Sequence, residues 1–173
     1  MSIAQSMLPE FDQEMANTRR TLERLPEDKL EFKPDPKSMA LGRLAGHIVE
    51  MVDWCTETLT KESLDLAPDG KEAFEPMVAK SRKQLLGALD KNIAEARKAL
   101  AGTTDEQIAK TWALMRNGKT ILSMPRVALV RTMIMNHIIH HRAQLTVYYR
   151  MLGVPVPALY GPSADEGTMG AGA

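Results

Sequence analysis

The sequence has a single cysteine, no excess of charge of either sign and no long apolar run, and each absence excludes a class of protein. Cys55 alone cannot build an internal disulfide framework or a cysteine-rich zinc finger. Lys and Arg together number 22, as do Asp and Glu, so the zero net charge argues against broad nucleic-acid binding and gives no attraction to an anionic membrane. Because about 18 consecutive apolar residues occur nowhere, we expect no transmembrane helix.

The remaining composition is that of an ordinary globular protein, with 44% hydrophobic and 25% charged residues among 173. A chain of this length suits one domain. The opening residues MSIAQS lack a basic start followed by an apolar core, so we expect no secretory signal and a cytoplasmic protein. Twelve methionines, against two Trp, three Tyr and three Phe, predict a core filled mainly by flexible aliphatic side chains.

Apolar residues recur at spacings of three and four over four long segments, which predicts four amphipathic helices. These helices are expected over residues 3–25, 40–60, 74–100 and 123–152. Pro26 ends the first helix and Gly153 ends the last. The predicted fold class is therefore all-α, a four-helix bundle in one domain over residues 1–163. We expect residues 164–173 to form a flexible C-terminal tail.

The segment before the fourth helix does not follow a helical pattern. Residues 103–106 offer an N-cap and a short helical turn. Residues 112–122 read as two short extended pieces around Asn117-Gly118, a dipeptide that favours a tight hairpin turn. An isolated two-stranded hairpin is only marginally stable. A short hairpin-like insertion and an irregular loop therefore stand here as equal alternatives.

Three of the four histidines fall within five residues on the last predicted helix. His141 lies about 40° around the helix and about 6 Å along it from His137, so both imidazoles project to the same side and can reach one ion. His140 lies about 100° around from His141 and is the weakest candidate ligand of the three. The fourth histidine, His47, lies on the apolar side of the second helix. It is a candidate third ligand, and the alternative is a core histidine that is hydrogen-bonded to a backbone carbonyl.

Three neutral imidazoles around one divalent ion would leave a coordination position for water or substrate, as catalytic metal sites do. Such an ion keeps its full charge and is a strong Lewis acid. Within a helix, Glu50 lies about 60° around from His47 and is a candidate to orient that ligand, against the alternative of a solvated carboxylate. Tyr148 and Tyr160 are candidates to border the pocket, and Tyr148 has a plain core position as its alternative.

Four stretches of this chain resemble a known family, the DinB/YfiT-like metalloenzymes of the DinB superfamily. The stretches are LAGHIVE at residues 44–50, NHIIHHRAQL at 136–145, YRMLG at 149–153 and PVPALYGPS at 155–163. The resemblance covers nearly the whole chain up to about Ser163, and the order of elements also fits. The family often has glycine where this chain has Ala143, a departure that we do not expect to touch the metal.

The resemblance implies a four-helix bundle with a long crossing between the second and third helices, commonly as a homodimer. It implies a nickel or zinc ion held by His47, His137 and His141, with His140 left out. Characterised relatives in the superfamily include transferases and isomerases that use low-molecular-weight thiols such as bacillithiol or mycothiol. Many other members have no known activity.

Our first hypothesis is a metal-dependent thiol S-transferase, in which a metal-activated thiolate attacks a small electrophile. A metal-dependent hydrolase is its nearest variant, and the ligand set separates neither these two reactions nor nickel from zinc. The alternative class is a non-catalytic dimeric helical protein in which the metal only stiffens the bundle. We favour an enzyme with a small-molecule substrate, and expect neither nucleic acid nor a membrane as its partner.

Other residues near the motifs are interpreted as structural. Arg142 and Gln144 match the family motif but are predicted to point away from His141 and to act as anchors. Trp54 is more typical of packing or of a dimer surface than of a substrate contact. Cys55 is expected to be a buried thiol without a redox role.

Overall fold

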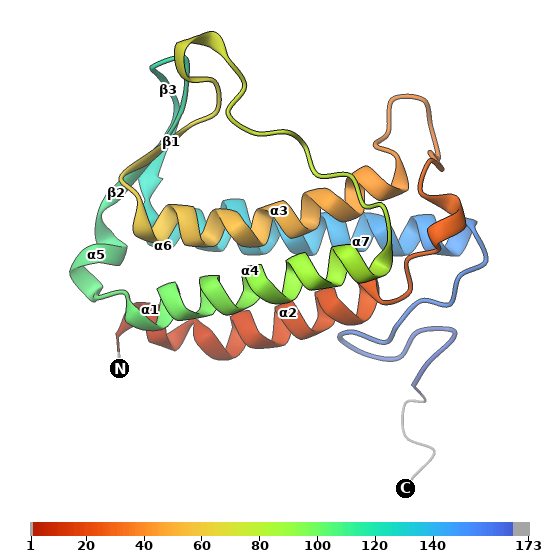
Figure 1. The fold of residues 1–173 in the computed structure, drawn as a ribbon. Coiled ribbons are helices and arrows are strands. Elements are labelled where there is room, and N and C mark those ends of the chain that lie inside the picture. Colours follow the sequence, from red (N-terminus) through yellow and green to blue (C-terminus); the bar gives the residue numbers. More distant parts are fainter. Residues whose placement is uncertain (1, 168–173) are drawn as a thin grey trace, which may run out of the picture.

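The computed structural model describes residues 2–167, most of them in helices, with a small sheet at one end of the helices (Figure 1). The helices are α1 (Ile3–Ser6), α2 (Leu8–Leu22), α3 (Leu41–Thr60), α4 (Arg82–Gly102), α5 (Asp105–Ala109), α6 (Arg126–Leu129) and α7 (Asn136–Met151). Two short 3-10 helices, η1 (Glu27–Lys29) and η2 (Pro68–Gly70), and a π-helical segment, η3 (Val130–Met135), accompany them. The strands are β1 (Ser63–Asp65), β2 (Thr111–Arg116) and β3 (Lys119–Pro125).

The long helices α2, α3, α4 and α7 lie side by side and bury their apolar faces against one another (Figure 1). α3 packs against α4 and α7, and α2 packs against the same two helices. α3 has the widest buried face, which includes Leu44, Ala45, Ile48, Val52, Cys55 and Leu59. His47 lies at the border of this face and is partly buried. Among residues 2–167, no helix combines the length and the apolar character that crossing a bilayer demands.

The first predicted helix is shorter than expected and is broken near its start. The break lies at Met7, and Pro9 then occupies an early position of α2, where its missing N–H costs little. α2 ends at Leu22 instead of Leu25, because the chain tightens into hydrogen bonds between residues three apart before Pro26. Leu25 is nevertheless fully buried, so the periodicity correctly marked it as a core residue.

The third predicted helix begins eight residues later than expected, at Arg82 instead of Phe74. Pro76 disfavours helical conformation in the residue before it. The true start is marked by Ser81, whose side chain accepts a hydrogen bond from the Gln84 amide. Residues 71–81 are instead an extended connection that crosses over α3 (Figure 1), and we refer to them as the strap.

The fold is helix-dominated but not all-α as predicted, because it contains a three-stranded sheet. The expected hairpin does form between β2 and β3, and its turn places Asn117 and Gly118 at φ 50° and 73°. β1 pairs in parallel with β2, with Leu64 opposite Leu114. This third strand was not predicted, and it supplies the pairing that a lone hairpin lacks. Asp65 in β1 accepts hydrogen bonds from both turn amides.

The last predicted helix is in fact composed of α6, η3 and α7 in succession. Residues 123–125 belong to β3 instead of the helix. The π-helical turns of η3 end at Met135, one residue before α7 begins, and such widened turns are frequent at functional sites. α7 ends at Met151, and Gly153 follows at φ 70°, as its predicted role as helix terminator requires.

The chain after α7 runs back along the helices. Within the predicted tail over residues 164–173, Asp165 pairs with Arg150, and Glu166 pairs with Arg24. The rest of that tail prediction, residues 168–173, lies outside the described residues.

Candidate metal centre

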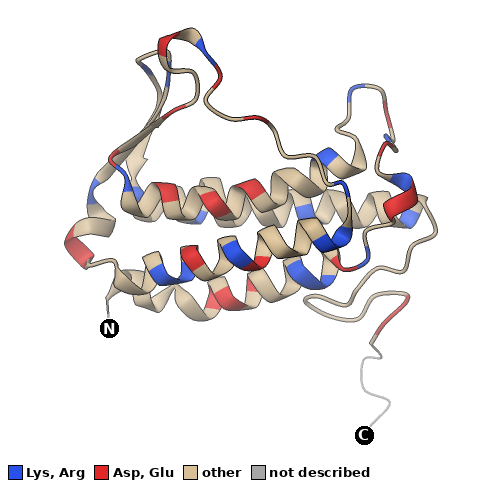
Figure 2. Cartoon of the chain, viewed as in Figure 1, with Lys and Arg blue, Asp and Glu red and all other residues tan. Residues whose placement is uncertain are grey.

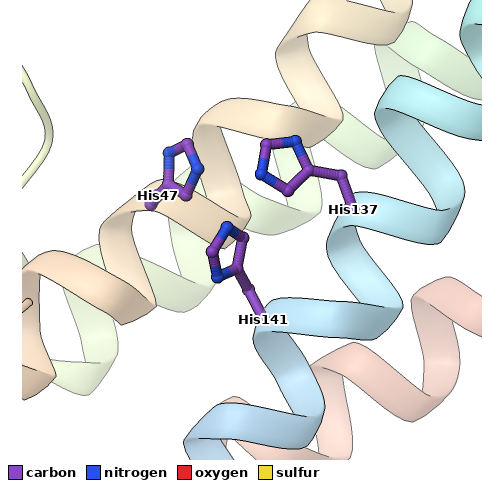
Figure 3. Close-up of side chains that lie close together, drawn as sticks. All are labelled: His47, His137 and His141. Carbon is purple, nitrogen blue, oxygen red and sulfur yellow. The ribbon is translucent and has the colours of Figure 1, made fainter. Parts of the chain in front are cut away.

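Three of the four histidines face one another between α3 and α7 (Figure 3). The ring centroids of His47 and His141 are 4.8 Å apart, those of His47 and His137 are 5.2 Å apart, and those of His137 and His141 are 4.6 Å apart. One nitrogen of each ring lies within 4.8 Å of the other two. The structure thus brings together the three residues that the sequence analysis named as ligands.

Both helices are needed to build this cluster. His137 and His141 lie one turn apart on α7 and project toward α3, as their spacing predicts (Figure 3). His47 comes from the facing side of α3, which packs against α7. His140 is also close, with its ring centroid 4.9 Å from that of His141, but it is exposed and is not part of the cluster.

Each of the three imidazoles has an oxygen atom beside its Nδ1 atom. The pairs are His47 with Glu50 Oε2 at 3.2 Å, His137 with the Met133 carbonyl at 3.3 Å, and His141 with Gln144 Oε1 at 2.7 Å. These oxygens accept hydrogen bonds, so in each neutral ring Nδ1 is the atom that donates. The lone pair is then on Nε2, which is the form of histidine that binds a metal while a neighbouring acceptor fixes the ring.

Burial keeps two of these rings neutral. It lowers the pKa of His137, and the nearby His47 adds to that effect, while the hydrogen bond to Met133 opposes it. Burial also lowers the pKa of His141 to about 4, against the opposing hydrogen bond to Gln144. Both groups are therefore unprotonated near neutral pH, as metal ligands must be.

Glu50 is not the solvated carboxylate that the sequence left as its alternative. Its Oε2 atom accepts hydrogen bonds from Arg43 at 2.9 Å and from His47, and its Oε1 atom accepts one from the Met77 amide of the strap. Burial raises the pKa of the Glu50 carboxyl, but the bonds from His47, the Met77 amide and Arg43 outweigh it, so the net pKa is lowered. Glu50 is therefore an ionised acceptor that orients His47.

The strap lies directly on α3 beside His47. A Cβ atom at Gly46 would come within 2.1 Å of the Met77 carbonyl oxygen, so only glycine permits this approach. Arg43 donates a hydrogen bond to the same carbonyl at 3.1 Å, and the Ala79 amide donates to the Gly42 carbonyl at 3.0 Å. The strap and the first two turns of α3 thus form one hydrogen-bonded unit next to the histidine cluster.

A cavity of about 620 Å³ opens beside the cluster, between α3, the strap and the sheet. His47 and His137 are part of its wall, whereas His141 is not. Much of the remaining wall is apolar and comes from all three elements, with Trp54 from α3, Phe74 from the strap and Leu114 from β2. The histidine cluster therefore has an accessible side, and that side faces a cavity of the size that binds small molecules.

The two candidate tyrosines do not border this cavity. Tyr148 is buried, packs edge-on against Phe32 and donates a hydrogen bond to the Met39 carbonyl at 3.2 Å. Tyr160 is 67% exposed, and its hydroxyl contacts Glu14 and Arg142 on another part of the molecule. Tyr148 thus packs α7 against the connection between α2 and α3, and Tyr160 links the chain after α7 to α2 and α7. Tyr148 therefore has the core position that the sequence analysis gave as its alternative.

Two other residues lie elsewhere than predicted, and two lie as predicted. Gln144 does not point away from His141 but accepts its hydrogen bond, and Trp54 lines the cavity instead of only packing. Arg142 is the buried anchor that was expected. Cys55 is fully buried, which raises the pKa of its thiol to about 12 and leaves it unreactive at neutral pH.

The spacing of Gln144 from His141 could have predicted their hydrogen bond, but the sequence analysis missed it. Glu50 follows His47 by three residues, and Gln144 follows His141 by three residues. Residues three apart are neighbours on a helix surface, so each can accept a hydrogen bond from the ring before it. The strap residue Met77 gives no comparable signal, because its contact depends on how the strap crosses α3.

We predict that Glu50→Ala weakens metal binding by about 10-fold to 100-fold, the usual effect of removing a partner that orients a ligand. The variant leaves Nδ1 of His47 without an acceptor and releases the Met77 amide. Glu50→Gln keeps one acceptor oxygen and should fall between Glu50→Ala and the unaltered protein. Competition with a chelator of known affinity measures the effect. Glu57→Ala on the same helix is the matched control, and an equal loss in that variant would contradict this role.

Comparison with known proteins agrees with this architecture. Residues 1–171 match the model of the DinB family. A DinB-like protein from Bacillus cereus ATCC 10987 aligns with a TM-score of 0.66 and 26% identity, over 90% of this chain and 97% of that one. A DinB-like protein from Bacillus subtilis, YjoA, aligns with a TM-score of 0.63 and 19% identity, over 87% of this chain and 96% of its own. A search of curated proteins finds no match. The match over nearly its whole length means that this chain belongs to the DinB family.

Proposed function

We propose that this protein is a divalent-metal-dependent enzyme, a thiol S-transferase that acts on small electrophiles, with nickel or zinc held by His47, His137 and His141. One observation carries the proposal. The three imidazoles converge with each Nδ1 beside an acceptor, and two of them, His47 and His137, line a cavity large enough for a small molecule.

The chemistry of the donor set fits the proposed ion. Neutral imidazoles suit nickel and zinc, and within residues 2–167 the three histidines are the group of potential ligands that lie close enough together. When bound, a divalent ion supplies Lewis acidity, which favours the deprotonated form of a thiol or of water. The accessible side supports catalysis over a purely structural role, because structural sites are closed by a fourth protein ligand.

The residues of the chain hold and shield the reactants. Glu50 and Gln144 keep the imidazoles in their metal-binding form, and the apolar wall around Trp54 excludes water from an electrophile in the cavity. In the proposed transfer the thiol sulfur forms a bond to the electrophilic carbon. The leaving group departs with the electron pair of its bond, and the thiol proton passes to solvent.

The same donor set would support hydrolysis, so the reaction type rests on the resemblance to thiol-using relatives. A homodimeric state is part of the proposal on the same basis, and we also propose a cytoplasmic location. Sedimentation analysis of the purified full-length chain tests the dimer, with a mass near twice 19.2 kDa as the supporting result and a mass near 19.2 kDa as the opposing one.

Incubation of the metal-loaded protein with a panel of thiols and 1-chloro-2,4-dinitrobenzene tests the activity. We expect thioether formation with at least one thiol, well above the uncatalysed rate, and loss of that excess after chelation of the metal. The His137→Ala/His141→Ala variant at the same total metal concentration controls for catalysis by free ions. If no thiol gives metal-dependent conjugation, the transferase proposal is wrong and the hydrolytic or structural alternative replaces it.

A further inference from the structure

The cavity beside the histidines has an unusual balance of charge. Its wall contains two arginines and five carboxylates. Both arginines are already engaged, since Arg43 binds Glu50 at 2.9 Å and Arg116 binds Glu72. Among residues 2–167, no Lys or Arg on this wall is therefore left unpaired to receive an anionic ligand.

Two of the five carboxylates, Asp53 and Glu75, have no partner among the described residues. Glu57 pairs with Lys61 at 2.6 Å, but the side chains of Asp53 and Glu75 form no ion pair or hydrogen bond within residues 2–167. Glu75 is exposed on the strap, whereas Asp53 is half-buried on α3 beside Trp54. The other acidic residues along α3 in Figure 2 are the two paired carboxylates Glu50 and Glu57, so in the part of the chain that the structure describes Asp53 is the unpaired acidic side chain of this helix.

The surroundings of Asp53 favour a positive partner. Burial raises the pKa of its carboxyl, and the negative charges of Glu57 and Glu95 raise it further, against Lys91 and Lys61. Lys91 and Lys61 pair with Glu95 and Glu57, so each of these pairs is close to neutral, and the charge of Asp53 itself is the one left unpaired. A cation from outside the chain would offset that charge.

The rest of the wall is suited to an apolar body. Leu64 of β1, Leu66 just after β1 and Leu114 of β2 form one side, and Trp54 and Met133 lie on the helices. Phe74 on the strap is 53% exposed and Met133 is 39% exposed, although both line the cavity. A ligand that covers such large apolar side chains gains the free energy of burying them.

We propose that the substrate of this site is an apolar electrophile that also carries an alkylammonium group, such as a haloarene with an aminoalkyl side chain; its apolar body rests on Trp54 and Phe74, its ammonium group lies at Asp53, and halide is the leaving group. In the metal-free protein, anionic molecules of the same shape are disfavoured. That this molecule is the electrophile rests on the proposed function. The preference for a cationic over an anionic ligand is a binding property, which can be measured without turnover.

Three probes of one shape test the preference: 4-phenylbutylamine, 4-phenylbutan-1-ol and 4-phenylbutyrate. Calorimetric titration of the full-length protein, both metal-free and metal-loaded, gives the dissociation constants. Emission of Trp54 reports where the probes bind, because the other tryptophan, Trp112, is 1% exposed and does not line the cavity. In the metal-free protein we expect the amine to bind about tenfold more tightly than the alcohol, and the carboxylate to bind most weakly.

Asp53→Asn should reduce binding of the amine to the level of the alcohol and leave the alcohol unchanged, which also shows that the variant is folded. Glu31→Gln removes one charge away from the cavity and should preserve the order of the three probes. The inference is overturned if the carboxylate binds the metal-free protein as tightly as the amine, if Asp53→Asn leaves the preference intact, or if no probe alters the emission of Trp54. If the protein binds no metal but the amine still binds more tightly than the alcohol and the carboxylate, only the proposed function is contradicted.

Discussion

Replacing both His137 and His141 by alanine is expected to abolish stoichiometric metal binding. The unaltered protein should retain close to one nickel or zinc ion per chain after loading and desalting. Of the three proposed ligands the variant keeps only His47, and a single imidazole does not hold a divalent ion against buffer exchange. Elemental analysis measures the metal content, and circular dichroism shows that the helices persist.

His140→Ala is the matched control for this loss. His140 is a histidine on the same helix, with its ring centroid 4.9 Å from that of His141, but it is exposed and outside the cluster. We expect His140→Ala to bind metal as the unaltered protein does. Retention of metal in the double variant would refute the ligand assignment, and so would loss of metal in the His140 variant.

Replacing Arg142 by alanine is expected to lower the free energy of unfolding by about 3–5 kcal/mol, the usual cost of leaving a buried charge without its partner. Arg142 is 1% exposed and donates to Glu14 Oε2 at 2.6 Å, to the Glu14 carbonyl at 2.9 Å and to Thr18 at 3.1 Å. It also donates to the Tyr160 hydroxyl of the C-terminal segment. Equilibrium unfolding in urea measures the loss.

Two further variants separate the buried charge from simple truncation. Replacing Arg142 and Glu14 together by methionine removes both charges and should recover much of the lost stability. Arg97→Ala breaks a half-exposed pair with Asp12 and should cost about 1 kcal/mol or less. If Arg142→Ala is no more costly than Arg97→Ala, the pair with Glu14 does not anchor the C-terminal segment.

The parts of the fold that follow from local pattern were predicted well. α3 occupies residues 41–60 against an expected 40–60, and the hairpin forms at Asn117-Gly118. The errors lie where a single residue or a distant partner decides the structure. Pro76 keeps the strap extended although its apolar residues fit a helical period. The three residues of β1 form a strand only because β2 lies beside them, which is a contact far along the chain.

The candidate site divides in the same way. The spacing of His137 and His141 on one helix predicts that they share an ion, whereas His47 joined them through the resemblance and not through its spacing. Glu50 and Gln144 lie at a readable distance from their histidines, and only Glu50 was singled out. Trp54 and the cavity could not be foreseen, because that wall exists only where the strap and the sheet both come over α3.

X-ray absorption spectroscopy of the nickel- or zinc-loaded full-length protein tests the three-imidazole site most directly. The spectrum should require three imidazole nitrogens, at about 2.0–2.1 Å for zinc, and one or more oxygen ligands from solvent. Addition of a thiol should introduce a sulfur neighbour, at about 2.3 Å for zinc. A spectrum with fewer than three imidazoles, or one that no thiol alters, would contradict a histidine triad with a position open to the cavity.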